Sequence, residues 1–196
     1  MDWNCKNILA VALDKTVYLW NAATREIQEL LTLDQDNYVS SLSYVHEGGH
    51  LLAVGTSNNN VEIWDTVKIA KTRTMCGHSA RVGSLAWRGQ MLTSGSKDTD
   101  IINHDHRARN HIVSQYRSHK QEVCGLAWNS DGLTLASGGN DNLLALWDIR
   151  RQNSGESSYY QPTHCCNDHL AAVKALVSHV SLVGPPQFAE FLCRRL

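Results

Sequence analysis

The segment Leu144-Ala145-Leu146-Trp147-Asp148 decides the fold, because the chain holds three earlier versions of it. These are Val17-Tyr18-Leu19-Trp20-Asn21, Val61-Glu62-Ile63-Trp64-Asp65 and Ile101-Ile102-Asn103-His104-Asp105. The aromatic residue recurs at positions 20, 64, 104 and 147, at intervals of 40 to 44 residues. Self-similarity at a period of that length indicates a repeat architecture.

Each unit divides into short β-rich runs separated by turn residues. In the fourth unit the runs are 122–128, 134–139 and 143–148, with turns at 129–132 and 140–142 between them. Strands of this kind form blades that cover their apolar faces only by packing on their neighbours. The sequence therefore predicts an all-β fold, a partial WD-repeat β-propeller of about four blades. The expected units are about 1–33, 34–77, 78–118 and 119–168, with the start of a fifth at 169–176.

The periodicity ends at Leu176. No turn Asp or Trp-Asp pair follows, and Pro185 and Pro186 interrupt the remaining segment. We expect 177–196 to be a non-repeat tail, either disordered or containing a short helix with Phe188, Phe191 and Leu192 on one face. About ten residues form only a marginal helix on their own.

Composition excludes several classes of partner. The net charge is −1, so no basic field marks a nucleic-acid surface. No apolar run approaches the ~18 residues of a membrane span, and the start Met1-Asp2-Trp3-Asn4-Cys5-Lys6 is too polar for a signal peptide. The six cysteines are irregularly spaced, which predicts reduced thiols in an intracellular protein.

A buried polar network is expected inside the third and fourth blades. A loop His, a strand Ser, a turn Asp and the residue at the Trp position would hydrogen-bond in series. The members are His78, Ser94, Asp98 and His104 in the third unit, and His119, Ser137, Asp141 and Trp147 in the fourth. When every member is satisfied, such a network fixes one blade geometry.

Catalysis and metal binding are not favoured. The histidines of 104–111 and the segment 164–169 lack the paired Cys-x-x-Cys spacing of strong zinc sites. Ser137, His119 and Asp141 resemble a hydrolase trio, but the repeat explains them and no oxyanion hole is evident. No Gly-rich phosphate-binding motif is present. We therefore expect no enzyme, no metal and no cofactor.

Asn140 and Asn142 bracket the turn Asp141, and turns of this kind gather on one rim of a propeller. Asparagine is common in turns because it tolerates left-handed backbone geometry. Two asparagines around one turn also offer amide donors and acceptors to a peptide. The residues alone leave both interpretations open.

Six longer motifs narrow the fold to a family. They are 12–20, 53–56, 77–87, 118–126, 136–142 (Ala-Ser-Gly-Gly-Asn-Asp-Asn) and 172–175. These motifs resemble the Fizzy family, the WD-repeat activators that bring substrates to the anaphase-promoting complex, a ubiquitin ligase. The similarity covers residues 2 to about 176. The first repeat is similar to the Fizzy branch and 169–174 to the Fizzy-related branch, so the branch stays open.

The resemblance implies a seven-bladed propeller whose rim reads short degradation motifs, or degrons, in cell-cycle control. Asn140 and Asn142 would bind the Lys-Glu-Asn type, with Asp2 as a further contact. Arg73 would lie in the groove between the second and third blades, which takes a second motif. The implied partners are subunits of the anaphase-promoting complex, degron-bearing substrates and spindle-checkpoint proteins, and the implied location is the nucleus and cytoplasm.

The chain also departs from the family pattern. Counterparts of the last blade, of the N-terminal ligase-binding segment and of the C-terminal Ile-Arg tail are not found, and the chain ends in Arg195-Leu196. Two alternatives therefore stay open. One is a truncated product that is inactive or competes with the full protein, and the other is a generic WD-repeat interaction scaffold.

Overall fold

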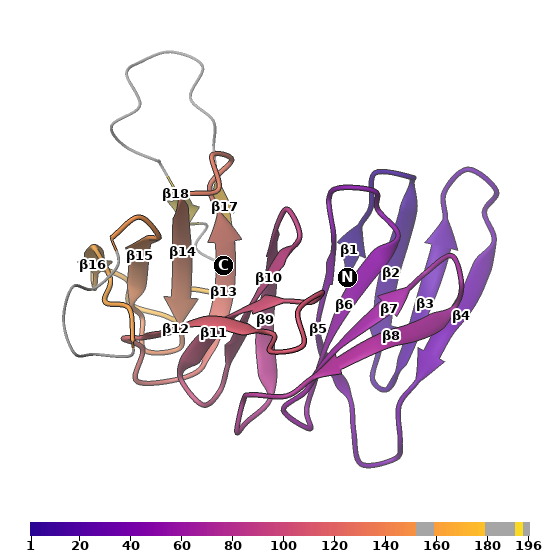
Figure 1. Cartoon of the computed structure of the whole chain (residues 1–196), viewed down its shortest axis with the longest axis horizontal. Helices are drawn as coiled ribbons and strands as arrows, with labels where there is room; N and C mark the ends of the chain where they lie inside the picture. The colour runs from indigo at the N-terminus through magenta and orange to yellow at the C-terminus, as the bar shows by residue number, and fades with distance from the viewer. Residues whose placement is uncertain (152–158, 179–190, 194–196) are drawn as a thin grey trace.

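The computed structural model describes residues 1–151, 159–178 and 191–193, and within them the regular elements are β-strands. Most of these strands form four antiparallel sheets of four strands each. The sheets follow one another along the molecule, from the indigo N-terminal sheet to the orange fourth sheet (Figure 1). This arrangement confirms the prediction of an all-β, partial propeller of about four blades.

In each sheet the hydrogen-bonded order of the strands is their order in the chain, and the first strands of the second, third and fourth sheets contact one another in turn. The first sheet contains β1 (Asp2–Trp3), β2 (Ile8–Leu13), β3 (Thr16–Asn21) and β4 (Ile27–Thr32). The second contains β5 (Val39–Tyr44), β6 (Leu51–Thr56), β7 (Val61–Asp65) and β8 (Ala70–Met75). The third contains β9 (Val82–Arg88), β10 (Met91–Ser96), β11 (Asp100–Asp105) and β12 (Ile112–Arg117). The fourth contains β13 (Val123–Trp128), β14 (Thr134–Gly139), β15 (Leu144–Asp148) and β16 (His164–Cys166).

The hydrophobic core lies between neighbouring sheets, in three apolar clusters. The second, third and fourth sheets each contribute a leucine at the equivalent position to these clusters. Leu52, Leu92 and Leu135 lie opposite the aromatic position of their own sheet and are 0% exposed. Each belongs to the cluster shared with the preceding sheet. The repeat therefore stabilises the fold through side chains that one blade cannot bury alone.

Glycines allow the sheets to approach closely near the rim. A Cβ atom added to any of three strand glycines would collide with a valine at the start of the next unit. The pairs are Gly55 with Val82, Gly95 with Val123, and Gly138 with Val173. Because glycine has no Cβ, the backbones can come together where a larger residue would separate the sheets.

The fifth unit begins with β17 (Leu176–Ser178), which lies beside β13. It pairs antiparallel with β18 (Phe191–Cys193), so here the structure differs from the predicted tail. A strand replaces the short helix at these residues, since the free edge of β17 offers backbone partners that an isolated helical turn lacks. Phe188, the other residue of the predicted helical face, lies outside the described residues.

Candidate peptide-binding rim

The turn between β14 and β15 carries the two asparagines of the predicted site. Asn142 has a φ of 63°, and its backbone N–H lies 3.3 Å from the Gly139 carbonyl oxygen. Asparagine tolerates this left-handed conformation better than most residues. The equivalent turn residues of the second and third sheets, Asn59 and Thr99, also have positive φ values, 65° and 77°. The backbone of this turn is thus a property of the repeat.

A series of hydrogen bonds between buried and half-buried side chains holds the turn in place. His119 Nδ1 lies 3.1 Å from Asp141 Oδ1, and His119 Nε2 lies 2.8 Å from Ser137 Oγ. The Trp147 indole N–H donates to the same Ser137 oxygen at 2.8 Å. Asp141 also accepts the backbone N–H of Lys120 at 2.7 Å. The predicted network of the fourth unit is therefore present, and Ser137 is 0% exposed, out of reach of a substrate.

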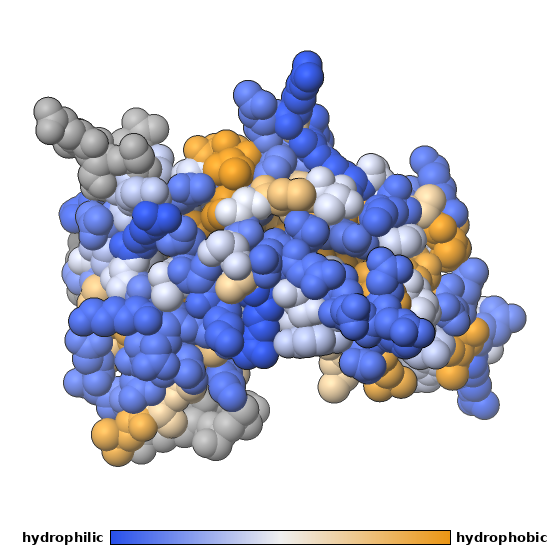
Figure 2. Space-filling view, turned by 90° about the horizontal axis from the view of Figure 1, so that it is seen from below, coloured by the Kyte–Doolittle hydropathy of each residue, from blue (hydrophilic) through white to orange (hydrophobic). Residues whose placement is uncertain are grey.

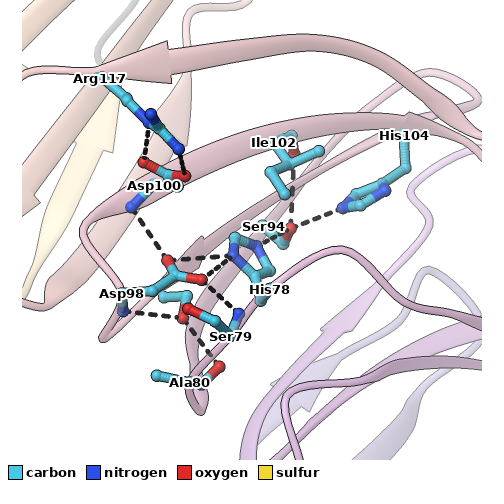
Figure 3. A network of polar contacts seen from close by, with 10 residues as sticks. His78, Ser79, Ala80, Ser94, Asp98, Asp100, Ile102, His104 and Arg117 are labelled. Carbon is cyan, nitrogen blue, oxygen red and sulfur yellow. Dashed lines mark hydrogen bonds and ion pairs between the residues drawn. The ribbon is translucent and has the colours of Figure 1, made fainter.

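The third sheet repeats the series with His104 at the Trp position (Figure 3). His78 lies between Asp98, 3.0 Å from its Nδ1, and Ser94, 2.8 Å from its Nε2. Ser94 Oγ lies 2.7 Å from His104 Nε2. The series then continues to His111, because the two Nδ1 atoms of His104 and His111 are 3.0 Å apart. This last link was not predicted, since His111 stands outside the repeat motif.

Burial and hydrogen bonding set the ionisation of these groups. Burial opposes ionisation of the Asp98 carboxyl, but the hydrogen bond and charge of His78 outweigh it and lower its pKa to about 2. Burial, followed by the charges of His111 and His78, lowers the pKa of His104 to about 3. His104 is therefore neutral at physiological pH, and the network holds a charged carboxylate only at its rim end.

Asn140 is exposed, and its side chain is oriented by a neighbouring loop. Its Nδ2 donates to Gln121 Oε1 at 2.8 Å, and its backbone N–H donates to the Glu122 carbonyl at 2.8 Å. Asn142 is half-buried, and no hydrogen bond of its side-chain amide to another described residue is found. The structure thus brings Asn140 and Asn142 together on one turn at the rim.

The rim continues across the third and second sheets through a charged link. Arg81 donates from Nε to Glu122 Oε1 at 2.7 Å and from Nη2 to Glu122 Oε2 at 2.6 Å. Its Nη1 lies 3.3 Å from the Tyr38 hydroxyl oxygen. Sequence reasoning missed these residues. The signal was available, because Tyr38, Arg81 and Glu122 each stand directly before the first strand of their sheet.

Asp2 lies at the start of the first sheet, and its predicted contact with a degron stays a prediction. It pairs with Ala10 in the middle of β2, away from the turn that follows Leu13. Its Oδ1 accepts the Trp3 N–H at 2.9 Å and its Oδ2 accepts the Tyr44 N–H at 2.6 Å. The carboxylate therefore connects the first sheet to the second, and no contact with the Asn140 turn is described.

Arg73 lies between the second and third sheets, as predicted, but its guanidinium is already hydrogen-bonded to backbone carbonyls. It donates to the carbonyl oxygens of His106 at 2.7 Å, Ala108 at 2.6 Å and Arg109 at 2.9 Å. These carbonyls belong to the turn after β11, at the opposite end of the third sheet from the rim. Arg73 thus stabilises a turn, and its predicted role in peptide binding stays a prediction.

Two absences concern the described residues alone. Among residues 1–151, 159–178 and 191–193, no group of three or more His, Cys, Asp or Glu side chains is placed to hold a metal ion. In the same part of the chain, no helix is long and apolar enough to cross a membrane.

Comparison with known proteins identifies the repeat. The family described as WD domain, G-beta repeat matches residues 27–65 and 110–148. A chain from the solved structure described as "Crystal Structure of Mitotic Checkpoint Complex" is 45% identical and superposes with a TM-score of 0.83. The match covers 90% of this chain and 52% of that chain.

Curated relatives agree with this match. The protein named anaphase-promoting complex subunit cdc20, from Dictyostelium discoideum, is 48% identical over 177 residues, which are 90% of this chain and 34% of the relative. Cell division cycle 20.1, cofactor of APC complex, from Arabidopsis thaliana, is 47% identical over 90% of this chain and 38% of its own length. Protein FIZZY-RELATED 1 from the same plant is 45% identical over 90% of this chain and 35% of its own length.

The similarity to these relatives covers most of this chain but only part of each relative. This chain spans about a third of the length of these curated relatives. Both Cdc20 and Fizzy-related proteins match at nearly the same identity, so the branch stays undecided. Over 90% of its length, this chain is a homologue of the Cdc20 and Fizzy-related WD-repeat proteins.

Proposed function

We propose that this chain is a non-catalytic substrate adaptor of the anaphase-promoting complex, which holds degron peptides on its rim while a separate enzyme ubiquitinates their owner. The proposal is supported by relatives whose names give them as a subunit or cofactor of that complex. The similarity to a chain of the mitotic checkpoint complex supports checkpoint proteins as further partners. The proposed place of action is the nucleus and cytoplasm.

The arrangement of the Asn140 turn is the observation that carries the proposal. Asn140 is exposed, and the side-chain amide of Asn142 makes no hydrogen bond to another described residue, while His119 fixes the Asp141 between them. A prearranged turn binds a short peptide without a further loss of loop entropy. Its two amides each offer a donor and an acceptor, which suits the mixed cationic, anionic and amide side chains of a Lys-Glu-Asn motif.

A direct binding measurement tests this proposal. The full chain is titrated into a fluorescent peptide that contains Lys-Glu-Asn, and anisotropy gives the Kd. The variant Asn140→Ala/Asn142→Gly removes both amides, and glycine at 142 keeps the positive φ without strain. We expect the Kd to rise about tenfold or more, which corresponds to ~1.4 kcal/mol of lost contacts.

The second sheet supplies a matched control. Asn59 has the same left-handed backbone as Asn142, so Asn59→Gly makes an equal backbone change in the equivalent turn two sheets away from the site. This variant should bind the peptide as the parent does. Equal binding of parent and double variant would contradict the proposed site. Binding that depends on the amides, without stimulation of ubiquitination by the complex, would favour a competing product over an activator.

A further inference from the structure

The rim turns of the second, third and fourth sheets share one backbone anchor. In each of these sheets, the residue directly before the first strand accepts, with its carbonyl oxygen, the N–H of the residue that opens the turn between the second and third strands. The pairs are Ser57 with Tyr38 at 3.0 Å, Lys97 with Arg81 at 3.0 Å, and Asn140 with Glu122 at 2.8 Å. Each turn is therefore held by the loop that enters its own sheet.

The loop that enters the fourth sheet holds Asn140 twice. The Glu122 carbonyl accepts the backbone N–H of Asn140, and Gln121 Oε1 accepts its side-chain N–H at 2.8 Å. Strand β14 points downward in Figure 1, so its rim turn lies at the lower end of that view, and Figure 2 looks onto this end across a mainly hydrophilic surface. Gln121 and Asn140 are both exposed there. The position of the Gln121-Glu122 dipeptide therefore controls where the Asn140 amide lies.

This dipeptide is itself fixed by the third sheet. Arg81 binds the Glu122 carboxylate through two N–H groups, at 2.7 and 2.6 Å, the bidentate geometry of the stronger charge-assisted hydrogen bonds. The Glu122 side chain is only 15% exposed. Gly83 leaves room for it, because a Cβ atom at Gly83 would lie 2.9 Å from Glu122 Oε1. The carboxylate thus has a defined place on the neighbouring sheet.

We propose that Arg81 is a positioning residue of the peptide site, which holds the Asn140 turn in its binding geometry through the side chain of Glu122. The inference rests on the proposed function, and it goes further by giving a residue of the third sheet control over a turn of the fourth. Among the described residues, no contact of the Arg81 side chain with Asn140 or Asn142 is found. Its effect passes through the loop, because a turn that is already ordered binds a peptide without a further loss of conformational entropy.

The chain contains a matched ion pair for comparison. Arg117 binds Asp100 in the same bidentate geometry, at 2.6 Å from each donor atom, at the outer edge of the third sheet. The side chains of this pair are 50% and 15% exposed, against 41% and 15% for Arg81 and Glu122. Arg117 also lies over the Tyr159 ring, 4.0 Å from its centroid, so loss of Arg117 should destabilise the fold at least as much as loss of Arg81.

Hydrogen exchange of the full chain, read by mass spectrometry, tests the positioning without any peptide. We expect the backbone amides of 139–143 to exchange about threefold to tenfold faster in Arg81→Gln, and at the parent's rate in Arg117→Gln. The reversed pair Arg81→Glu/Glu122→Arg restores an ion pair and leaves the backbone carbonyl of position 122 in place, so its exchange should return to the parent's rate. Parent-like exchange in Arg81→Gln, or equal acceleration in both single variants, would overturn the proposal.

Anisotropy with the fluorescent Lys-Glu-Asn peptide is the second readout. We expect Arg81→Gln to raise the Kd about threefold to tenfold, Arg117→Gln to leave it unchanged, and the reversed pair to bind within about twofold of the parent. A direct contact between Arg81 and the peptide would not be restored by moving the cation to position 122. Weak binding by both Arg81→Gln and a folded reversed pair would therefore overturn the positioning role.

A further variant covers the case in which the reversed pair does not fold, as judged by far-ultraviolet circular dichroism. Glu122→Gln keeps Arg81 but removes the charge that holds it, so it should weaken peptide binding in the same direction as Arg81→Gln. Unchanged or tighter binding by Glu122→Gln would overturn the proposal. A parent that does not bind the peptide at all would overturn the proposed function, and the exchange rates of 139–143 would still decide whether Arg81 positions the turn.

Discussion

His119 Nδ1 lies 3.1 Å from Asp141 Oδ1, and this contact ties the rim turn to the loop that enters β13. The loop supplies Gln121, which orients Asn140, while the turn supplies both proposed peptide-binding amides. A buried structural link and the candidate site therefore share one element. A change in the network should affect stability and peptide binding together.

Replacement of Asp141 tests this coupling. Asp141→Ala removes the acceptor of His119 and of the Lys120 amide, leaving a buried imidazole without its partner. We expect a loss of about 1.5–3 kcal/mol in the free energy of unfolding, measured with urea, because one partner of these bonds is charged. Peptide affinity should fall as well. Asp36→Ala, at an exposed loop position, should change neither quantity.

Gly138 tests the close approach between the fourth sheet and the fifth unit. Gly138→Ala drives a Cβ atom into Val173, both its side chain and its carbonyl oxygen. Overpacking of this kind costs about 1–3 kcal/mol of stability, readable as a lower thermal midpoint. Gly77→Ala is the control, because its Cβ would meet only the ends of flexible isoleucine side chains. Equal midpoints for the two variants would contradict the packing described here.

The lowered pKa of His104 predicts that the folded protein loses stability in acid. Its folded pKa of about 3 lies below the ordinary value of 6.5, so below pH 6.5 the unfolded chain takes up a proton that the folded chain refuses. Stability from this group is complete above pH 6.5 and is lost as the pH falls toward 3. Between pH 6.5 and 5 the loss is about 2 kcal/mol, at ~1.4 kcal/mol per pH unit.

The variant His104→Trp provides the comparison for that profile. Tryptophan occupies this position in the other three sheets and does not titrate. Chemical unfolding at several pH values should give a shallower decline for this variant than for the parent. A decline of the same slope in both proteins would assign the acid sensitivity to other groups, such as His106 and His111, whose pKa values burial also lowers.

Arg73 separates a structural role from a peptide-binding role. Arg73→Ala removes the donors to the carbonyls of His106, Ala108 and Arg109, so we expect a stability loss of about 1–3 kcal/mol. Arg73→Lys should recover only part of it, because an ammonium group cannot reach all three acceptors with a planar fork. Unchanged unfolding with weakened binding of a degron peptide would assign Arg73 to the groove instead.

Much of the fold could be predicted from the sequence because it is periodic. Trp20, Trp64, His104 and Trp147 recur at a spacing that only a repeat explains, and each is the second-last residue of the third strand of its sheet. The network was predictable for the same reason, since a missing repeat residue such as the Trp replaced by His104 is visible against its counterparts. The partner of His104, His111, could not be predicted, because no other unit repeats it.

The candidate site was predictable only in part. Asn140 and Asn142 are close in sequence, so one turn brings them together whatever the rest of the chain does. Asp2 and Arg73 act over long separations, and their partners Tyr44 and Ala108 depend on how two sheets are set against each other. Strand β18 depends in the same way on an edge that exists only once β17 is in place.

The sequence by itself determined the blades, their number in this chain and the turn that presents two asparagines, since local spacing and strand periodicity fix these features. The tertiary structure alone decided which polar groups are occupied by neighbouring sheets and which apolar faces of the described strands are buried. The physical reason is that a strand chooses its face by alternation within a few residues. Whether that face is buried depends on a neighbouring sheet, and the chain supplies that sheet about forty residues away.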